Sequence, residues 1–370
     1  KPEVFSLTGF ELLIILVLLS TTIAFLVAPG PTFDRVHTSA WYVPILALIP
    51  GLLYTLIYQS LITNSPYPLP LMLEYYWGRI IGWLLSFFYA CYFLVWVSLW
   101  VRLFLDFQLS VINPMQPISV LLAGILIVAM YGLKRGLTTT IRALEIIFGL
   151  VVGLEIFLII MALLKTDFSN LLPLYHTKPL TLATAVLFFS RFYAVTGITL
   201  ILGHFLIDKS NPGRTARHAL ILIAFFLAIT FMVTMGVIGN LIANDAYPIF
   251  DMVRRLQIGS FVRNLDALFI ATWFVGVFFG IFILWFGFIY ILQQMFRLSD
   301  YRPLAPATVM IVGIMAVGLG SNSVEVKDLQ LKVMYPLIMI FMVIIPLLTW
   351  VIGLIRGQIK LKTTSAKSSS

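Results

Sequence analysis

Charged residues are scarce in this sequence. Only 11 % of its 370 residues are Asp, Glu, Lys or Arg, whereas 61 % are hydrophobic. A soluble domain carries about 25 % charged residues, so this chain has too few charges to cover a water-facing surface of its size. The composition argues against a soluble enzyme, a disordered regulator and a nucleic-acid binder, and it indicates an integral membrane protein.

Cysteine is almost absent as well. Cys91 is the single cysteine, which excludes an internal disulfide and a disulfide-bonded scaffold. The four histidines show no metal-ligand spacing, and the sequence contains no phosphate-binding loop, dinucleotide fingerprint or nucleophile motif. We therefore expect no metal site, no cofactor and no enzyme activity.

Long apolar runs dominate what is present. A helix needs about 20 apolar residues to cross a bilayer, and ten runs qualify. They cover approximately residues 10–28, 40–62, 79–105, 117–133, 142–164, 183–207, 215–243, 264–292, 304–321 and 331–355. Transmembrane β-strands would instead alternate over segments of about 10 residues, a pattern that does not occur here. The predicted fold class is an all-α polytopic membrane protein with ten transmembrane helices.

The sequence also indicates where the bundle starts and how it is oriented. Thr8 and Glu11 have the spacing of a capping box, which predicts a helix start at the first span. Fourteen of the 24 Lys and Arg residues fall on the side of the two termini, nine fall on the other side and Arg191 lies inside a span. Because Lys and Arg accumulate on the cytoplasmic side, we expect both termini to be cytoplasmic, with the basic tail (about 356–370) near anionic lipid.

Ten spans with both ends on one side divide into two halves of five. Because five is odd, the second half (about 183–355) would be inverted relative to the first (about 8–164), within a single transmembrane domain over 1–370. In such inverted repeats the first helix of each half is interrupted near the bilayer centre. Spans 1 and 6 carry Ser20-Thr21-Thr22-Ile23 and Thr196-Gly197-Ile198-Thr199 in their middles. Hydroxyl residues and glycine suit such breaks, and they equally suit tight helix contacts.

Several stretches, in order along the chain, carry a resemblance to a known family. They are Leu73-Glu74-Tyr75-Tyr76-Trp77-Gly78, Cys91-Tyr92-Phe93-Leu94, Asn170-Leu171-Leu172-Pro173, Tyr247-Pro248-Ile249-Phe250 and Phe261-Val262-Arg263-Asn264-Leu265-Asp266. These stretches resemble motifs of the B subunit of endospore germinant receptors, the spore germination permeases. The resemblance runs from about residue 6 to about residue 358.

This resemblance implies a LeuT-like fold of the amino acid–polyamine–organocation superfamily. It also implies A- and C-type partner subunits in the spore inner membrane. Two departures stand out: Asp266 replaces the family's usual Glu, and Val195 and Gly197 lie where the family often carries a glycine and an acidic residue. The identity of the ligand is therefore not carried across.

A solute site is expected at the membrane midplane, between spans 1, 3, 6 and 8. The candidates for binding a ligand are Ser20, Thr21, Thr22, Tyr92, Tyr193, Thr196, Gly197 and Trp273. The N-termini of interrupted helices direct partial positive charge at a carboxylate, which suits an amino acid as the ligand.

Glu155 and Arg191 are the two charges that lie deep within spans, 5 and 6 respectively. A charge at the bilayer centre costs several kcal/mol unless it is paired or hydrated, so both are candidates for function. They either pair across the bundle, as a coupling or merely structural ion pair, or Glu155 titrates as a proton-coupling carboxylate.

The stretch from Tyr247 to Arg263 is the longest organised segment on the side opposite the termini. Pro248 suits a first helical turn, so we expect a short helix there, either as a gate over the outer vestibule or as an interfacial anchor. Together with these features, the resemblance implies a receptor subunit that binds a small nutrient germinant, expected to be an amino acid, and signals to partner subunits. A proton-coupled amino acid transporter and an inactive scaffold are the alternatives.

Overall fold

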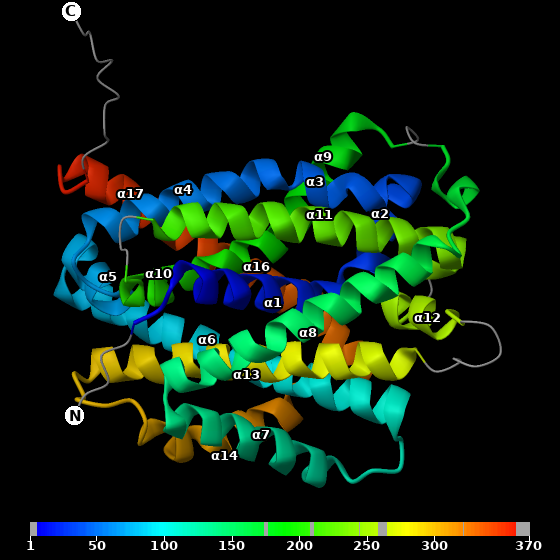
Figure 1. The fold of residues 1–370 in the computed structure, drawn as a ribbon. Coiled ribbons are helices and arrows are strands. Elements are labelled where there is room, and N and C mark those ends of the chain that lie inside the picture. Colours follow the sequence, from blue (N-terminus) through cyan, green and yellow to red (C-terminus); the bar gives the residue numbers. More distant parts are fainter. Residues whose placement is uncertain are drawn as a thin grey trace, which may run out of the picture.

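The computed structural model describes residues 6–173, 177–207, 211–243, 245–257, 265–320 and 322–359. Within these ranges the chain is almost entirely helical, and the helices lie side by side in one bundle (Figure 1). The first half contains α1 (Gly9–Val27), α2 (Pro29–Val36), η1 (His37–Tyr42), α3 (Val43–Leu46), α4 (Leu48–Asn64), α5 (Leu69–Trp77), α6 (Arg79–Phe107), η2 (Gln108–Ile112), α7 (Ile118–Arg135), α8 (Leu137–Leu163) and η3 (Phe168–Leu171). The second half contains α9 (Pro179–Ala194), η4 (Val195–Ile198), α10 (Thr199–Leu202), η5 (Gly203–Phe205), α11 (Pro212–Ile238), η6 (Gly239–Ala243), α12 (Pro248–Arg254), α13 (Asp266–Met295), α14 (Leu304–Gly318), α15 (Ser323–Leu329), η7 (Gln330–Met334), α16 (Tyr335–Met339), η8 (Ile340–Ile344) and α17 (Ile345–Ile355).

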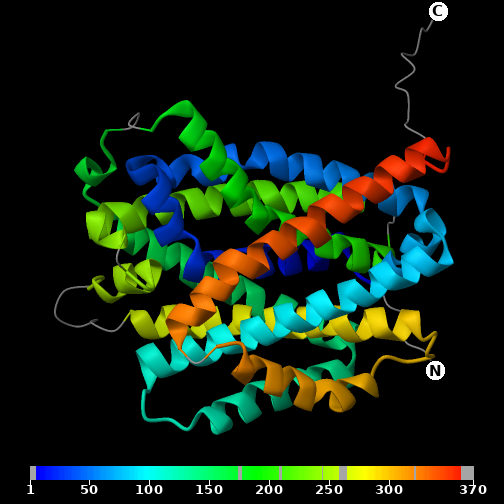
Figure 2. The same cartoon turned by 180° about the vertical axis from the view of Figure 1, so that it is seen from behind.

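These helices confirm a polytopic membrane protein. Nine helical stretches of the described chain are long and apolar enough to cross a membrane, and α14 is a shorter apolar helix of 15 residues. Each of the ten predicted spans coincides with one of these stretches. The start of α1 and the end of α17 lie at the same end of the bundle, on the left in Figure 1 and on the right in Figure 2. We call this the terminal end, and the opposite one the distal end.

The predicted helix start at the terminal end is confirmed. Thr8 and Glu11 form a reciprocal capping box, in which the Thr8 backbone N–H donates to the Glu11 carboxylate at 2.6 Å and the Glu11 N–H donates to Thr8 Oγ1 at 3.1 Å. Just before the cap, Leu7 forms an isolated parallel β-bridge with Leu206, at the end of span 6. This bridge holds the start of span 1 and the end of span 6 together at the terminal end.

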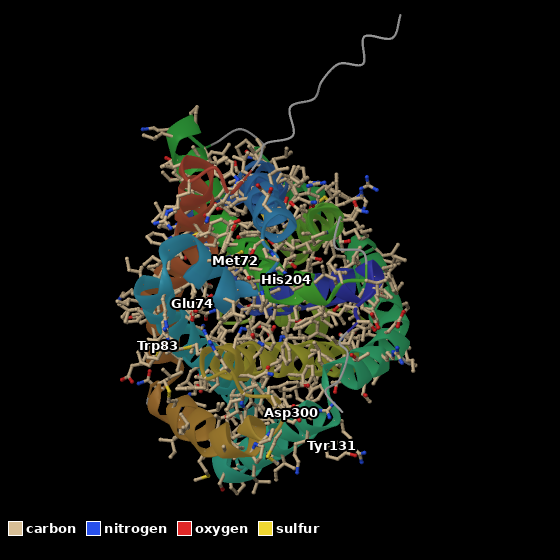
Figure 3. The ribbon with its side chains drawn as sticks, turned by 90° about the vertical axis from the view of Figure 1, so that its left-hand side faces the viewer. Met72, Glu74, Trp83, Tyr131, His204 and Asp300 are labelled. Atoms are coloured by element: carbon tan, nitrogen blue, oxygen red, sulfur yellow. The ribbon has the colours of Figure 1, made fainter. Side chains whose placement is uncertain are left out.

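At the terminal end α5 folds back between spans 2 and 3. Gly78 links α5 to α6 with a φ of 86°, a left-handed conformation that glycine adopts without steric penalty. Seen from this end (Figure 3), Met72 of α5 lies inside the bundle and Trp83 of α6 lies at its edge. Met72 is accordingly buried, whereas Trp83 is exposed. The reversal sends α6 into the centre of the bundle.

Span 1 is one uninterrupted α-helix, so the predicted break at Ser20-Thr21-Thr22-Ile23 is wrong. The Thr21 hydroxyl donates to the Val17 carbonyl at 2.8 Å, which satisfies this side chain within the helix. Thr22 packs against Gly276 of α13, where an added β-carbon would lie 2.1 Å from Thr22 Oγ1. The small hydroxyl residues therefore serve a close helix contact rather than an interruption.

Glycines also let α6 and α13 approach each other in the core. An added β-carbon at Gly280 would lie 1.9 Å from the Trp100 ring, and one at Gly287 would lie 2.7 Å from the Phe93 ring. Trp100 and Phe93 are both buried, so neither ring has free space to move into. Aromatic rings of span 3 thus pack directly on the backbone of span 8.

We predict that Gly280→Val destabilises the protein by about 3 kcal/mol, because overpacking a tight core costs about 1–3 kcal/mol or more. Thermal unfolding in detergent measures the effect as a lower melting temperature. Gly124→Val in α7 is the matched control, since no atom in the described part of the chain lies within 4 Å of its added β-carbon. Equal melting temperatures for the two variants would contradict the close packing of spans 3 and 8.

Candidate functional site

Span 6 changes its helical geometry in the region that the sequence singled out. The α-helix α9 ends at Ala194, the 3-10 helix η4 covers Val195–Ile198, and a second 3-10 helix ends the span. A 3-10 stretch inside a helix often marks a functional hinge. The α-helical hydrogen bonding is thus interrupted at Thr196 and Gly197, although the span does not unwind into separate helices.

Span 10 is irregular as well, and it contacts η4. The span contains two π-helical turns, η7 and η8, and η8 lies against η4. In η8 the N–H of Ile345 donates to the Ile340 carbonyl, and Pro346 has no N–H. The carbonyl of Phe341 therefore loses its α-helical donor and its π-helical donor together. π-Helical turns occur frequently at functional sites.

Tyrosines from spans 2 and 3 occupy the carbonyls that η8 leaves free. The hydroxyl of Tyr89 donates to the Phe341 carbonyl, and the hydroxyl of Tyr58 donates to the Met342 carbonyl. Tyr92 stacks on the Phe341 ring, with centroids 4.7 Å apart and an interplanar angle of 16°. The hydroxyl of Tyr92 is buried and makes no hydrogen bond to the described residues.

Gly197 brings these elements together. An added β-carbon would lie 2.7 Å from Met342 Sδ and 3.2 Å from the Tyr58 hydroxyl. We call this region the inner site: Val195–Ile198 of span 6, Ile340–Ile344 of span 10, and the side chains of Tyr58, Tyr89 and Tyr92. The solute site predicted from the sequence did not include residues of spans 2 and 10. Pro346 is the residue that could have indicated the irregular hydrogen bonding in span 10.

The other predicted ligand residues divide between the inner site and packing roles. Thr196 donates its hydroxyl to the Tyr193 carbonyl at 2.7 Å, and the Tyr193 hydroxyl donates to the Pro44 carbonyl at 2.7 Å. The hydroxyl of Ser20 is buried without a hydrogen bond to the described residues, in a span that lies against η4. Ser20 therefore has a free hydroxyl in a span that contacts the inner site, whereas the hydroxyl of Tyr193 is already satisfied.

Trp273 belongs to a different cluster, at the distal end. Its ring lies 4.4 Å from the Phe107 ring, and Phe107 also contacts Tyr247 and Phe250. The predicted short helix in this region is α12, which begins at Pro248 as expected and packs on this cluster; residues 258–264 lie outside the described residues. The structure therefore brings Trp273 together with α12, not with Tyr92.

Arg191 is held by aromatic rings. Its guanidinium carbon lies 3.0 Å from the centroid of the Phe188 ring and 3.5 Å from that of the Tyr335 ring. The guanidinium of Arg35 lies 3.5 Å from the same Phe188 ring. Arg191 is 4 % exposed, and its Nε and Nη2 have no hydrogen-bond partner among the described residues. Cation–π contacts with the half-buried Phe188 ring and the buried Tyr335 ring offset part of the cost of burying this charge.

Glu155 does not pair with Arg191, so that part of the hypothesis is wrong. Glu155 lies in an apolar niche between spans 1, 5, 7 and 8, beside Phe25, Phe226 and Phe269. Within the described ranges no ion pair joins Glu155 to any basic residue. Arg191 meets its aromatic partners in span 10 instead, and the two charges occupy separate parts of the bundle.

The fold and the site together define a class: a multi-pass helical membrane protein with a polar site between irregular segments of two central spans. The chain matches the family model described as "Spore germination protein" over residues 6–323, and it therefore belongs to the spore germination protein (spore permease) family. The resemblance noted from the sequence is confirmed. This is a family of germination receptor-type membrane subunits rather than of enzymes.

Two curated relatives are also spore germination proteins. The chain is 20 % identical to Spore germination protein KB of Bacillus subtilis (strain 168) over 321 residues, which is 85 % of this chain and 85 % of the relative. It is 25 % identical to Spore germination protein XB of Bacillus anthracis over 160 residues, 43 % of this chain and 45 % of that relative. Both support a receptor-type membrane subunit.

Proposed function

We propose that this chain binds a small nutrient germinant, an amino acid, at the inner site and signals to A- and C-type partner subunits. The juxtaposition of η4 with η8 is the observation that carries this proposal. Both segments depart from α-helical hydrogen bonding, and a solute would reach the freed carbonyls of η8 by displacing the hydroxyls of Tyr89 and Tyr58. The unpaired hydroxyls of Tyr92 and Ser20 supply further polar groups.

The proposal includes the location and the wider arrangement. The family supports a subunit of the spore inner membrane, and the charge asymmetry supports cytoplasmic termini. Span 1 lies against spans 6 and 8, and span 8 lies against span 3. This neighbourhood supports a LeuT-like pair of inverted five-helix repeats, related to the amino acid–polyamine–organocation permeases, in a single transmembrane domain.

Binding and transport measurements on proteoliposomes separate a receptor from a transporter. We expect saturable binding of tritiated L-leucine without its accumulation inside the vesicles. A receptor transmits a signal to its partner subunits and does not have to concentrate its ligand. Net uptake would contradict a pure receptor. The absence of saturable binding would favour an inactive scaffold.

A proton-coupled amino acid transporter is the second candidate, and Glu155 is the observation that favours it. This carboxyl lies in a membrane span without an ion-pair partner among the described residues. A transporter would lose pH-gradient-driven uptake in the Glu155→Gln variant, which keeps the side-chain size and removes the titratable proton. We expect instead that Glu155→Gln leaves L-leucine binding within about twofold of wild type, because the niche is separate from the inner site and a twofold change is less than about 0.5 kcal/mol.

A further inference from the structure

A cavity of about 170 Å³ opens at the distal end, between α2, α12 and the start of span 10. We call it the distal pocket, and the residues that matter here are Leu26, Asp34, Asp245, Lys327, Gln330 and Tyr335. A cavity of about 150 Å³ in a protein core is large enough to bind benzene, so this pocket accommodates a small amino acid. It lies outside the inner site described above.

The pocket carries charges of both signs. Asp34 and Asp245 supply carboxylates, and Lys327 supplies an ammonium group. Asp34 is exposed, and Asp245 and Lys327 are half-buried, so the charged groups lie toward water. The segment that carries Asp245 packs close to α2: a β-carbon added at Gly30 would lie 3.7 Å from the Ile242 carbonyl and 3.9 Å from the Asp245 carbonyl, at ordinary van der Waals distance.

Polar groups without partners lie deeper in the pocket. Gln330 is 3 % exposed, and its side chain makes no hydrogen bond to the described residues. In η7 the N–H of Tyr335 donates to the Gln330 carbonyl, and Pro336 has no N–H. The carbonyl of Leu331, another residue of the pocket lining, therefore lacks both helical donors. This repeats the arrangement at Phe341, except that no tyrosine hydroxyl of the described residues donates to the Leu331 carbonyl.

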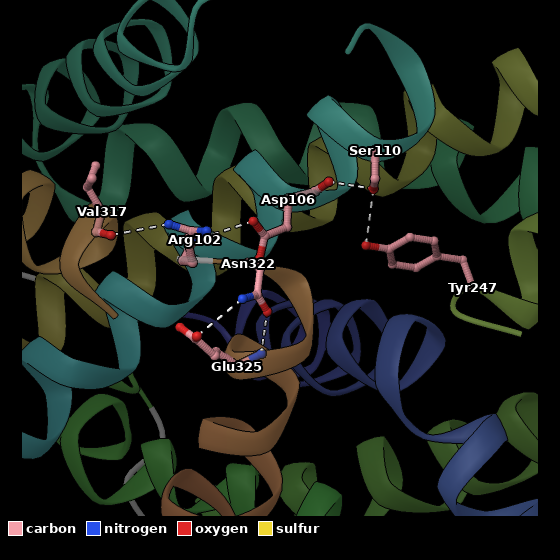
Figure 4. A network of polar contacts seen from close by, with 7 residues as sticks. All are labelled: Arg102, Asp106, Ser110, Tyr247, Val317, Asn322 and Glu325. Atoms are coloured by element: carbon pink, nitrogen blue, oxygen red, sulfur yellow. Dashed lines mark hydrogen bonds and ion pairs between the residues drawn. The ribbon is translucent and has the colours of Figure 1, made fainter. Parts of the chain in front are cut away.

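A hydrogen-bonded network holds the two charged walls of the pocket in place (Figure 4). Asn322 and Glu325 cap the start of α15, the helix that carries Lys327. The Arg102 guanidinium, which is paired with Asp106 at 3.0 Å, donates to the Val317 carbonyl just before that cap.

The same network reaches the opposite wall. Ser110 donates to the Asp106 carbonyl, and its hydroxyl lies 3.4 Å from that of Tyr247. The Tyr247 N–H in turn donates to the Asp245 carboxylate at 2.8 Å. Both charged walls are therefore tied to the end of span 3. A preformed arrangement of this kind lowers the ordering cost of binding a ligand.

The apolar part of the pocket lining suits an aliphatic side chain on the ligand. Leu26, Val27 and Leu331 line the pocket beside the polar groups. A metal ion is a poorer occupant, because no group of three or more His, Cys, Asp or Glu residues occurs in the described part of the chain. An ammonium, a carboxylate and an aliphatic side chain on one small molecule would match the acids, Lys327 and the apolar wall.

The floor of the distal pocket leads toward the inner site. Gln330 and Tyr335 also line a cavity of about 10 Å³ beneath it, which reaches Ile23, Trp96 and Val195. A cavity of that size holds about one water molecule, so an amino acid cannot pass without a movement of these side chains. The guanidinium of Arg191 lies on the Tyr335 ring at this constriction.

We infer that the distal pocket binds an aliphatic α-amino acid as its zwitterion, as a first station above the inner site. The carboxylate contacts Lys327, the ammonium contacts Asp34, Asp245 and the Leu331 carbonyl, and the side chain lies on Leu26 and Val27. This inference rests on the proposed nutrient-binding function, and it adds the ligand class and the route of entry.

Equilibrium binding of tritiated L-leucine to the purified protein in lipid nanodiscs tests the inference. We expect two binding components in the wild type, one for each site. Lys327→Met should weaken one component about tenfold, the effect of losing a charge-assisted hydrogen bond. Lys332→Met is the matched control, because Lys332 is an exposed partner of Asp328 outside the pocket, and it should change binding by less than about twofold.

Analogues of leucine assign the individual contacts. 3-Methylbutylamine lacks the carboxylate, so Lys327→Met should leave its affinity unchanged. 4-Methylpentanoate lacks the ammonium, so Asp245→Asn should leave its affinity unchanged while it weakens L-leucine binding. Asp328→Asn serves as the control for the acidic side.

The outcomes separate this inference from the proposed function. If Lys327→Met and Asp245→Asn bind L-leucine like the wild type while Gly197→Leu loses all binding, the distal pocket is not a site and the proposed function stands. If Gly197→Leu binds normally and Lys327→Met does not, the distal pocket is the site and the inner site is wrong. A wild-type protein that binds no L-leucine overturns both.

Discussion

A Gly197→Leu variant is expected to abolish the germination response of spores to their nutrient while the protein still accumulates. At this position a β-carbon alone would lie 2.7 Å from Met342 Sδ and 3.2 Å from the Tyr58 hydroxyl, and leucine adds three more carbon atoms. The leucine side chain would fill the space between spans 6 and 10 in which we propose that the ligand binds, and a loss of about 3 kcal/mol of binding free energy corresponds to about a 100-fold loss of ligand affinity. The loss of optical density of spore suspensions measures the response.

Two variants provide the controls: a smaller substitution at Gly197 and the same substitution at an exposed glycine in another span. Gly197→Ala should reduce the response less, because the sulfur of Met342 is the end of a flexible side chain that can shift. Gly153→Leu in α8 is the second control: no atom of the described residues lies within 4 Å of a β-carbon added there, so this variant should respond like the wild type. A normal response of Gly197→Leu at equal protein level would remove the inner site from the mechanism.

An Arg191→Met variant is expected to lose the nutrient response without losing stability. The guanidinium is buried between Phe188 and Tyr335 with two nitrogens unpaired, so the folded protein bears a desolvation cost of several kcal/mol that the rings only partly offset. Methionine fills a similar volume without the charge. The melting temperature should therefore equal or exceed that of the wild type, while the response falls by about tenfold or more, because stabilised variants at strained functional positions often lose function.

Two further variants distinguish a functional charge from simple packing. Arg191→Lys keeps the charge but replaces the planar, weakly hydrated guanidinium by a compact ammonium that stacks poorly, so it should behave like Arg191→Met in the germination assay. Arg35→Met removes the guanidinium of an exposed residue that contacts the same Phe188 ring, and it should respond normally. A wild-type response of Arg191→Met would make Arg191 a structural residue only.

The positions of the helices were predictable from the sequence because the bilayer demands long apolar runs with satisfied backbones. Each predicted span matches a helical stretch, including the short α14, and the Thr8–Glu11 cap lies where its spacing indicated. The 3-10 segment in span 6 was also predictable, because a glycine among hydroxyl residues weakens the α-helix there.

The inner site was only partly predictable, because composition does not say which face of a helix a residue occupies. Ser20, Thr21 and Thr22 have the same residue types as the break in span 6, yet Thr22 is needed for the contact with Gly276. The pairing of Glu155 with Arg191 failed because aromatic rings can also stabilise a buried cation, and their positions depend on tertiary packing. The part that span 10 plays in the inner site was not predicted, because the free carbonyl of Phe341 depends on a π-helical turn as well as on Pro346, and the hydropathy of the span does not indicate that turn.

Photo-affinity labelling tests the central claim most directly, namely that an amino acid binds between span 6 and span 10. The purified protein in nanodiscs is irradiated with the diazirine analogue of L-leucine, and the labelled peptides are mapped by mass spectrometry. We predict adducts within Val195–Ile198 or Ile340–Ile344 that disappear with excess L-leucine and in the Gly197→Leu variant. Adducts confined to lipid-facing positions, or labelling of these segments that neither L-leucine nor Gly197→Leu reduces, would contradict the account.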